Sequence, residues 1–345
     1  MTPDSASMPL ASPDASRPEA DARAGAAAGR ATSGSVWPWV RVIAGAFVFA
    51  LALRAFAFDA YRIPSTSMED TLLVGDFVFV SKLHYGPRVL GRRLPGFGEV
   101  ERGDVMVFHY PPGLEALDDR TPYIKRVVGL PGDSVVIADK AVRAGPEAVP
   151  APRDGRQLWE VRLGDAFPAD SLRTLGLSRR IQRVSDGRWL AEATAAQAGR
   201  LGAVAGVESV RPFVRPLGDG SAAFPGAARF SLDNYGPVAV PEAGVPVRLD
   251  DESWPVLRTA IERFEGRTAE RSATGFLIDG RPAETVTFSQ DYYFVLGDNR
   301  DDSADSRTWG FVPRDHLIGK AVLVYYSWDA DAGTPRWDRF GKTVE

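Results

Sequence analysis

The sequence of 345 residues contains no cysteine and only three histidines. A chain without cysteine forms no disulfide, offers no thiol nucleophile and builds no cysteine-ligated metal site. The histidines lie far apart and lack the spacing of metal ligands, so we interpret them as structural. They are His84, His109 and His316. We therefore expect no metal and no other cofactor.

Sequence motifs of several enzyme classes are absent as well. The chain has no Gly-x-x-x-x-Gly-Lys-Ser/Thr loop, no Gly-x-Gly-x-x-Gly and no His-Glu-x-x-His. It also lacks the Gly-x-Ser-x-Gly turn that carries the nucleophile of Ser-His-Asp hydrolases. The formal net charge is −4 and the basic residues are dispersed, which does not favour a nucleic-acid partner. If a serine is the nucleophile, we do not expect its base to be histidine.

The first 60 residues divide into a polar tail and an apolar run. Residues 1–36 are mostly small or polar and cannot bury enough surface to offset their chain entropy, so we predict a disordered tail. Residues 37–58 read WPWVRVIAGAFVFALALRAFAF, which is long enough to span a membrane. Residues typical of a membrane interface lie near both ends of this run, namely Trp37, Trp39, Arg41, Arg54 and Tyr61. We predict one uncleaved transmembrane helix over residues 37–60, in contact with membrane lipid.

Beyond the apolar run, two separate regions have the pattern of antiparallel β structure. Gly-Asp pairs at residues 75–76 and 103–104 precede β-branched runs, which is typical of turns that lead into strands. The expected strands cover residues 77–80, 105–108, 123–128, 134–138, 276–278, 286–288, 292–296 and 321–326. We expect residues 276–278 and 286–288 to form a hairpin around Asp279-Gly280. The sequence therefore predicts a mainly β fold whose principal domain has two parts, residues 61–138 and 274–345.

Residues 139–273, which separate these two parts, are rich in Ala, Arg, Pro and Gly and carry few strand signals. We expect helices over residues 192–201 and 251–264, the second capped by Asp250 or Asp251. One face of the second helix is apolar through Trp254, Leu257, Ile261 and Phe264. The pattern predicts an inserted α+β subdomain without catalytic residues.

Two stretches carry residues that suit proton transfer between a serine and a lysine. Ser65 and Ser67 lie two residues apart in a turn that begins at Pro64. Lys125 lies in a β-branched run, where burial would lower its pKa so that the neutral amine accepts a proton from a serine. Taken alone, the serines also fit an ordinary turn and the lysine also fits a water-facing edge strand. On these residues alone both interpretations stay open.

Four blocks in a fixed order extend this pattern over much of the chain. They are residues 64–68 (PSTSM), 103–107 (GDVMV), 123–133 (YIKRVVGLPGD) and 297–310 (GDNRDDSADSRTWG). Through these blocks the chain resembles the bacterial type I signal peptidases, the membrane-bound serine/lysine leader peptidases. The last two blocks are long and specific. None of the four blocks lies in the inserted region.

The resemblance implies a role for each residue that matches the family pattern. Ser67 corresponds to the nucleophile and Lys125 to the general base. Ser65 corresponds to the hydroxyl that, with the Ser67 backbone N–H, forms the oxyanion hole. Ser303 corresponds to the hydroxyl that orients the lysine amine. Asp305 and Arg307 correspond to an ion pair near the site, and Asp298 belongs to the same supporting loop. Ile63 and Ile124 correspond to apolar residues that line the substrate pockets.

The same resemblance implies where the protein is located and which substrates it cuts. The two-part β domain would be catalytic and would lie on the extracytoplasmic side of the plasma membrane, held by a single span. Its substrates would be exported preproteins, which it would cut after a small-x-small sequence to remove the signal peptide. The implied reaction needs no metal or nucleotide.

The chain departs from the family pattern directly after the nucleophile. The family commonly has proline two residues after the methionine, whereas this chain has Asp70, preceded by Glu69. Two acids here would disfavour negative charge on an oxyanion or would cap the following turn. This departure supports one alternative, a non-catalytic membrane-anchored β-rich binding or assembly protein. Self-cleaving repressors of related architecture are disfavoured because they would have a DNA-binding domain in place of the apolar run.

Overall fold

The structure, a computed structural model, describes residues 36–89, 91–164, 167, 171, 174–177, 180–216, 223–225 and 230–345, without the side chains of Ala52 and Ala55. Apart from Val36, the predicted disordered tail lies outside the described residues. The chain divides into two units, residues 1–47 and residues 48–345.

Helix α1 (Trp37–Phe56) is the first element among the described residues. Its apolar side chains are exposed, among them Val42, Phe47 and Phe49. Among the residues that the structure describes, no helix combines the length and the apolar character that crossing a membrane requires.

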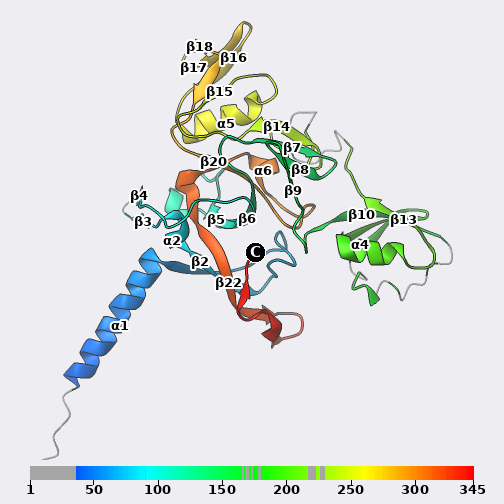
Figure 1. Cartoon of the computed structure of the whole chain (residues 1–345), viewed down its shortest axis with the longest axis horizontal. Helices are drawn as coiled ribbons and strands as arrows, with labels where there is room; N and C mark the ends of the chain where they lie inside the picture. Colours follow the sequence, from blue (N-terminus) through cyan, green and yellow to red (C-terminus); the bar gives the residue numbers. More distant parts are fainter. Residues whose placement is uncertain are drawn as a thin grey trace, which may run out of the picture. The chain divides into compact units, whose positions relative to one another are not determined.

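The second unit is built around a nine-stranded sheet, as the mainly β prediction requires (Figure 1). Its strands follow the order β1-β2-β22-β5-β6-β20-β21, while β23 and β24 also pair with β22. The paired strands are all antiparallel. Their bounds are β1 (Phe58–Arg62), β2 (Asp76–Ser81), β5 (Val105–His109), β6 (Pro122–Gly129), β20 (Tyr292–Leu296), β21 (Val312–Pro313), β22 (Leu317–Asp329), β23 (Thr334–Pro335) and β24 (Lys342–Thr343). The antiparallel β architecture is therefore confirmed.

The chain also contains smaller sheets. One has the order β14-β7-β8-β9, a second the order β11-β12-β10-β13 and a third the order β16-β17-β18. The pairs β15-β19 and β3-β4 complete the set. The strands are β3 (Arg88–Val89), β4 (Arg92–Arg93), β7 (Ser134–Ala138), β8 (Ala141–Ala144), β9 (Glu147–Val149), β10 (Arg156–Leu163), β11 (Ile181–Ser185), β12 (Arg188–Thr194), β13 (Val207–Pro212), β14 (Tyr235–Ala239), β15 (Pro246–Arg248), β16 (Ala269–Ser272), β17 (Gly275–Ile278), β18 (Arg281–Ala283) and β19 (Thr285–Thr287).

The remaining described helices are short, and they are α2 (Lys82–Tyr85), α4 (Ala195–Gly202), α5 (Trp254–Phe264) and α6 (Ser306–Trp309), with single 3₁₀ turns at Leu117–Asp119, Arg314–His316 and Trp337–Arg339. The four-stranded sheet β10–β13 and helix α4 lie within the region expected to be inserted. The predicted domain boundaries stay predictions.

The helix expected over residues 192–201 starts later than predicted. Residues 188–194 form strand β12, and α4 begins at Ala195. The reason is a capping box at Thr194: its hydroxyl accepts from the Gln197 N–H at 3.2 Å, and the Gln197 side chain accepts from the Thr194 N–H at 3.0 Å. A threonine in this role ends the strand and starts the helix.

The second expected helix forms, but its cap differs from the prediction. Helix α5 begins at Trp254 behind Ser253, and neither Asp250 nor Asp251 is the N-cap residue. Instead the Asp250 carboxylate accepts from the N–H and the hydroxyl of Ser253 at 2.7 and 2.8 Å, so it stabilises the turn before the helix. The predicted apolar face is confirmed, since Trp254 and Ile261 are buried.

The predicted partner of the strand at residues 276–278 is wrong. Asp279 and Gly280 both have positive φ, at 53° and 73°, as a two-residue hairpin turn requires. Because this turn has only two residues, β17 pairs with β18, the strand that follows the turn immediately. Residues 285–287 pair with β15 instead.

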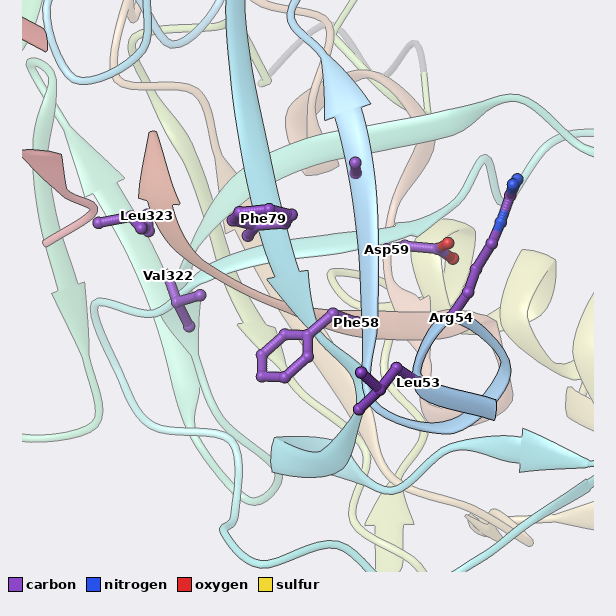
Figure 2. A pocket seen from close by; sticks show the side chains of 8 residues that line it. Leu53, Arg54, Phe58, Asp59, Phe79, Val322 and Leu323 are labelled. Carbon is purple, nitrogen blue, oxygen red and sulfur yellow. The ribbon is translucent and has the colours of Figure 1, made fainter. Parts of the chain in front are cut away.

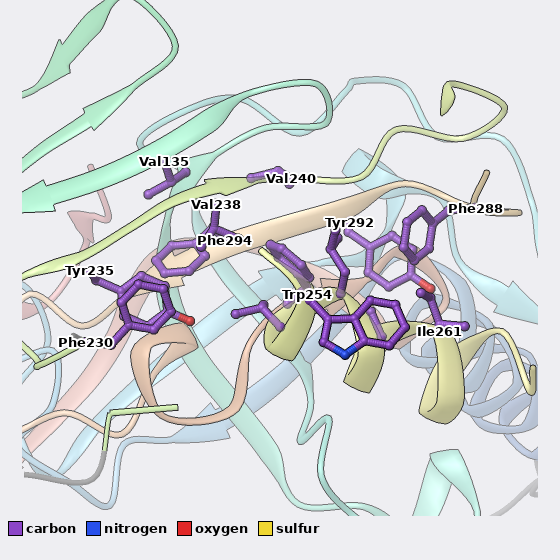
Figure 3. Close-up of a cluster of buried hydrophobic side chains, with 14 of the residues drawn as sticks. Val135, Phe230, Tyr235, Val238, Val240, Trp254, Ile261, Phe288, Tyr292 and Phe294 are labelled. Carbon is purple, nitrogen blue, oxygen red and sulfur yellow. The ribbon is translucent and has the colours of Figure 1, made fainter. Parts of the chain in front are cut away.

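The largest hydrophobic core lies between α5 and the strands β7, β14 and β20, where aromatic side chains face one another (Figure 3). Trp254 and Ile261 of α5 pack in the same cluster as Tyr292 and Phe294 of β20. A large apolar side chain that becomes fully buried contributes about 1.5–3 kcal/mol. This core therefore fixes β20, and with it the loop that follows at residue 297.

Candidate active site

Ser67 lies in the turn that joins β1 to β2. The turn is closed by the Ile63 N–H, which donates to the Asp76 carbonyl at 2.8 Å, and by the Leu72 N–H, which donates to the Met68 carbonyl at 2.7 Å. Met68 and Leu72 are fully buried in an apolar cluster with Ile63. Since the residues on both sides of Ser67 are anchored, the serine is held in place although it belongs to a turn.

Lys125 lies in β6, in the interior of the main sheet between β5 and β20. Its side chain is only 3% exposed. The amine Nζ lies 2.7 Å from Ser67 Oγ and donates to the Ile124 carbonyl at 2.8 Å. The alternative of a lysine on a water-facing edge strand is therefore wrong.

Burial lowers the pKa of Lys125 to about 8, although Asp305 and Asp298 act in the opposite direction by favouring the charged amine. Taking an ammonium group out of water disfavours its charged form. One pH unit below this pKa about a tenth of the amine is consequently neutral, and a neutral amine accepts a proton. The contact with Ser67 Oγ has the length that such a transfer requires.

Ser65 lies beside the dyad. Its hydroxyl oxygen is 3.5 Å from Ser67 Oγ, and its side chain is exposed, whereas Ser67 is buried. An exposed hydroxyl beside Ser67 Oγ is compatible with the oxyanion-hole role that the resemblance implies for Ser65.

The loop after β20 supports the turn of Ser67 directly. The Asn299 N–H donates to the Ser67 carbonyl at 3.1 Å. Asp298 accepts from the Arg126 guanidinium at 2.8 and 2.7 Å, and its carboxylate also accepts from the Thr71 hydroxyl at 2.6 Å. Asp298 thus connects β6 to the turn of the nucleophile.

Ser303 does not contact the lysine amine in the way the resemblance implies. Its hydroxyl oxygen is buried and makes no hydrogen bond to the lysine amine; it lies close enough to Asp305 to help lower the pKa of that carboxylate. It lies next to Gly297, because a Cβ on that glycine would be 2.2 Å from Ser303 Oγ and 2.6 Å from the Ser67 carbonyl oxygen. The orientation of the amine comes from the Ile124 carbonyl, which the sequence analysis did not identify.

Asp305 and Arg307 form a buried ion pair, and their side chains are 0% and 2% exposed. The guanidinium donates to the carboxylate at 2.8 and 2.7 Å and to the Arg300 carbonyl at 2.7 Å. Burial alone would raise the pKa of Asp305, but the charge of Arg307 and the Gly297 N–H hold it below its usual value. The pair shapes the loop and does not contact the dyad.

Ile63 and Ile124 line one groove of about 230 Å³. Its walls come from the end of β1 and the beginning of β6, together with β2 and β5, and are mostly apolar. The lining residues are Tyr61, Arg62, Ile63, Pro64, Val78, Val80, Val107, Thr121, Pro122, Tyr123 and Ile124. Ile63 precedes the turn of Ser67 and Ile124 precedes Lys125 in sequence, whereas neither Ser67 nor Lys125 is among the residues that line the groove.

A larger apolar pocket of about 710 Å³ lies elsewhere, and Figure 2 shows its lining. It is formed by Leu53, Arg54, Phe58, Asp59, Ala60, Phe79, Val322 and Leu323. None of the residues expected in the active site contributes to it. Among the described residues no cluster of three or more His, Asp or Glu side chains has the arrangement of a metal site.

Comparison with known proteins shows the family to which the chain belongs. The family model described as "Signal peptidase, peptidase S26" matches residues 36–182 and 250–328. Signal peptidase I of Pseudomonas fluorescens is 31% identical over 291 residues, which cover 81% of this chain and 68% of that protein. Signal peptidase I of Pseudomonas aeruginosa is 29% identical over 84% of this chain and 73% of its own length, and that of Aquifex aeolicus is 28% identical over 83% and 82%. The chain therefore belongs to the signal peptidase family, peptidase S26, and is a serine endopeptidase of the signal peptidase I kind.

Proposed function

We propose that Ser67 is the nucleophile and Lys125 the general base of the reaction that removes signal peptides from exported preproteins. The observation that carries this proposal is the 2.7 Å contact between Ser67 Oγ and the amine of a lysine whose side chain is 3% exposed. The depressed pKa of Lys125, about 8, supports the same role because it makes the neutral amine accessible near physiological pH.

In the first half of the reaction Ser67 Oγ attacks the scissile carbonyl carbon while its proton passes to Lys125 Nζ. The Ser65 hydroxyl and the Ser67 N–H stabilise the oxyanion that forms. Lys125 then gives its proton to the leaving amine, and the bond between the signal peptide and the mature protein breaks. In the second half, water gives a proton to Lys125 and attacks the acyl carbonyl; Lys125 then returns the proton to Ser67 Oγ as the acyl bond breaks, which releases the signal peptide and restores both residues.

The substrates are preproteins with small side chains at two alternate positions before the cleaved bond. The groove of about 230 Å³ supports this, because its apolar walls include Ile63 and Ile124, which the resemblance assigns to the substrate pockets. In an extended peptide, alternate side chains point to the same face, so two small residues separated by one position enter the groove together. A shallow apolar groove favours Ala-like side chains over large or charged ones.

The enzyme is held at the plasma membrane by a single span over residues 37–60, with its catalytic domain on the extracytoplasmic side. The support is the apolar sequence of residues 37–58, which includes positions whose side chains the structure does not describe. The exposure of Phe58 and Phe79 beside the 710 Å³ apolar pocket (Figure 2) also favours contact with lipid, because soluble proteins rarely leave such surface in water.

The experiment that tests this function is cleavage of a purified preprotein with an Ala-x-Ala site, in detergent, by the unaltered chain and by Lys125→Ala. The exposed Lys342 provides the matched control, Lys342→Ala. Cleavage by the unaltered chain and the control, but not by Lys125→Ala, supports the proposal. Turnover by Lys125→Ala at the unaltered rate would exclude the lysine as base. Absence of cleavage by folded unaltered chain would favour a non-catalytic anchored protein.

A further inference from the structure

The two acids that follow Met68 each form an ion pair with an arginine of the region between residues 139 and 273. Asp70 Oδ2 lies 2.6 Å from Arg156 Nε, and Arg156 also donates to Asp70 Oδ1 at 3.1 Å. The Glu69 carboxylate accepts from Arg180 at 3.0 Å. The side chains of Asp70 and Glu69 are 24% and 12% exposed, so water screens these pairs only partly.

Arg156 is itself fixed on several sides. Its side chain is 8% exposed and its guanidinium also donates to Gln197 at 3.3 Å. Its backbone N–H donates to the Asp298 carbonyl at 3.0 Å, and its carbonyl accepts from the Arg300 N–H at 2.9 Å. Arg156, the first residue of β10, therefore contacts the loop after β20 through its backbone. Its side chain contacts the turn between β1 and β2 that contains Ser67, which we call the nucleophile turn.

Arg180 belongs to a second chain of contacts that returns to the same turn. Besides Glu69, it donates to Glu192 at 2.6 Å. Glu192 also accepts from the Asn299 side-chain amide at 3.1 Å, and the Asn299 N–H donates to the Ser67 carbonyl. The nucleophile turn is thus enclosed between the arginines and the loop that holds Ser67 by its backbone.

The backbone of Asp70 shows why this turn needs support from outside. Its φ is +73°, in the left-handed region that aspartate tolerates better than most residues. Proline, which the family commonly has at this position, is locked near −65° and cannot adopt this conformation. The turn of this chain is consequently not held by a proline ring, and the ion pair between Asp70 and Arg156 takes that place.

We propose that Arg156 and Arg180 are positioning residues for the nucleophile Ser67, which makes the region between residues 139 and 273 a working part of the active site. They hold the turn at Glu69 and Asp70, and they neutralise two carboxylates that would otherwise oppose the negative charge of the oxyanion. This inference rests on the proposed function, since it assigns the role of these residues in that reaction.

The test measures kcat and KM for a preprotein with an Ala-x-Ala site, using the full chain, Arg156→Gln and Arg156→Lys. The concentration of active enzyme is taken from the burst of acyl-enzyme. We expect Arg156→Gln to lower kcat about tenfold with KM changed less than about twofold, because a misplacement of roughly 1 Å at a nucleophile costs up to about a hundredfold in rate. Arg156→Lys restores the charge and should recover part of the rate.

A double variant separates charge from packing. Asp70→Asn keeps a residue that tolerates positive φ but removes the carboxylate that Arg156 neutralises. The variant Arg156→Gln/Asp70→Asn should therefore be faster than Arg156→Gln alone, because no unpaired carboxylate remains beside the oxyanion. A double variant as slow as the product of the two single effects would contradict the electrostatic part of the proposal.

Arg211→Gln is the matched control. Arg211 lies in β13 of the same sheet and donates to Glu160 at 3.0 Å. Arg211 belongs to none of the contacts that enclose the nucleophile turn, so the kcat of Arg211→Gln should equal that of the unaltered chain. If Arg156→Gln also keeps the unaltered kcat per active enzyme and differs only in melting temperature, the arginine has a structural role alone and the proposal is overturned.

Failure of the proposed function would be visible separately, as absence of cleavage by the unaltered chain. In that case amide hydrogen exchange decides the positioning role. The Leu72 N–H, which donates to the Met68 carbonyl at 2.7 Å, should exchange faster in Arg156→Gln and Arg180→Gln than in Arg211→Gln. Equal exchange in all three variants would overturn the proposal.

Discussion

The backbone N–H of Asn299 donates to the carbonyl oxygen of Ser67 at 3.1 Å, although the two residues are far apart in sequence. This bond fixes the backbone of the nucleophile, not its side chain, and leaves Ser67 Oγ free to face Lys125. Gly297 lies just before Asn299 and passes so close to the Ser67 carbonyl that no side chain fits there.

We therefore expect Gly297→Ala to lower activity strongly. The added Cβ would lie 2.6 Å from the Ser67 carbonyl oxygen, a backbone atom that has no freedom to move aside. The matched control is Gly199→Ala, because Gly199 lies in α4 and a Cβ there meets nothing within 4 Å. Rates per folded enzyme for both variants provide the measurement. Full activity of Gly297→Ala would show that the close approach is not needed.

The dyad gives the sharpest expectation for single substitutions. Ser67→Ala and Lys125→Ala should each lower kcat by roughly 10⁴-fold or more, because neither residue works without the other. Ser65→Ala should lower kcat only about 100-fold to 1,000-fold, since it removes one oxyanion donor and leaves the Ser67 N–H. Single-turnover cleavage rates distinguish the two classes, and an equally complete loss in Ser65→Ala would argue for a different role of this serine.

Activity should depend on pH through Lys125. Its pKa is about 8, and only the neutral amine accepts the proton of Ser67. We expect kcat/KM to rise about tenfold per pH unit below pH 8 and to level off above it. A pH profile measured on the full chain provides the check. A rising limb centred near the ordinary lysine value would show that burial does not lower this pKa in solution.

The same pKa predicts a change of stability with pH. The pKa of Lys125 is about 8 in the folded chain and near its ordinary 10.5 in the unfolded chain. Between these values the unfolded state binds more protons, so the contribution of Lys125 to stability rises with pH from about 8 to 10.5 and is lost as pH falls through 8. Lys125→Met should flatten this rise. Denaturant titrations at several pH values in this range measure the free energy of unfolding. If it rises with pH equally in the unaltered chain and in Lys125→Met, the prediction is contradicted.

The buried pair Asp305–Arg307 should matter far more for stability than a surface pair. Arg307→Met leaves a buried carboxylate without its partner, which typically costs about 3–5 kcal/mol. The pair of Arg258 and Glu262 on α5 is largely exposed, so Arg258→Met should change stability by about 0.5 kcal/mol or less. Urea titrations of both variants provide the comparison, and similar midpoints would mean that the buried pair is not structurally important.

The dyad and much of the main sheet were predictable from the sequence because local patterns encode them. Gly-Asp turns and β-branched runs locate β2, β5 and β6, and the motif blocks identify Ser67 and Lys125. From its apolar neighbours alone the burial of Lys125 stayed open beside a water-facing edge strand, and the structure shows that the lysine is buried.

Other features depend on contacts between distant segments, which no local pattern encodes. Neither Arg156 nor Arg180 stands out in an arginine-rich stretch, and their importance appears only when Asp70 and Glu69 lie beside them. The hairpin partner of β17 was missed because the apolar run at residues 286–288 looked stronger than the short strand that follows Gly280. The start of α4 was missed because Glu192 fits a helix by propensity, whereas the cap at Thr194 decides the boundary.

The position of β22 in the main sheet has a consequence for biosynthesis. This strand lies between β2, which follows the nucleophile turn, and β5, which pairs with the strand of Lys125. A ribosome therefore makes both halves of the dyad long before it makes the strand that joins them. A growing chain that has not reached residue 317 cannot assemble the sheet that brings serine and lysine together. The complete sheet that holds Ser67 beside Lys125 therefore forms only after β22 (Leu317–Asp329) has been synthesised.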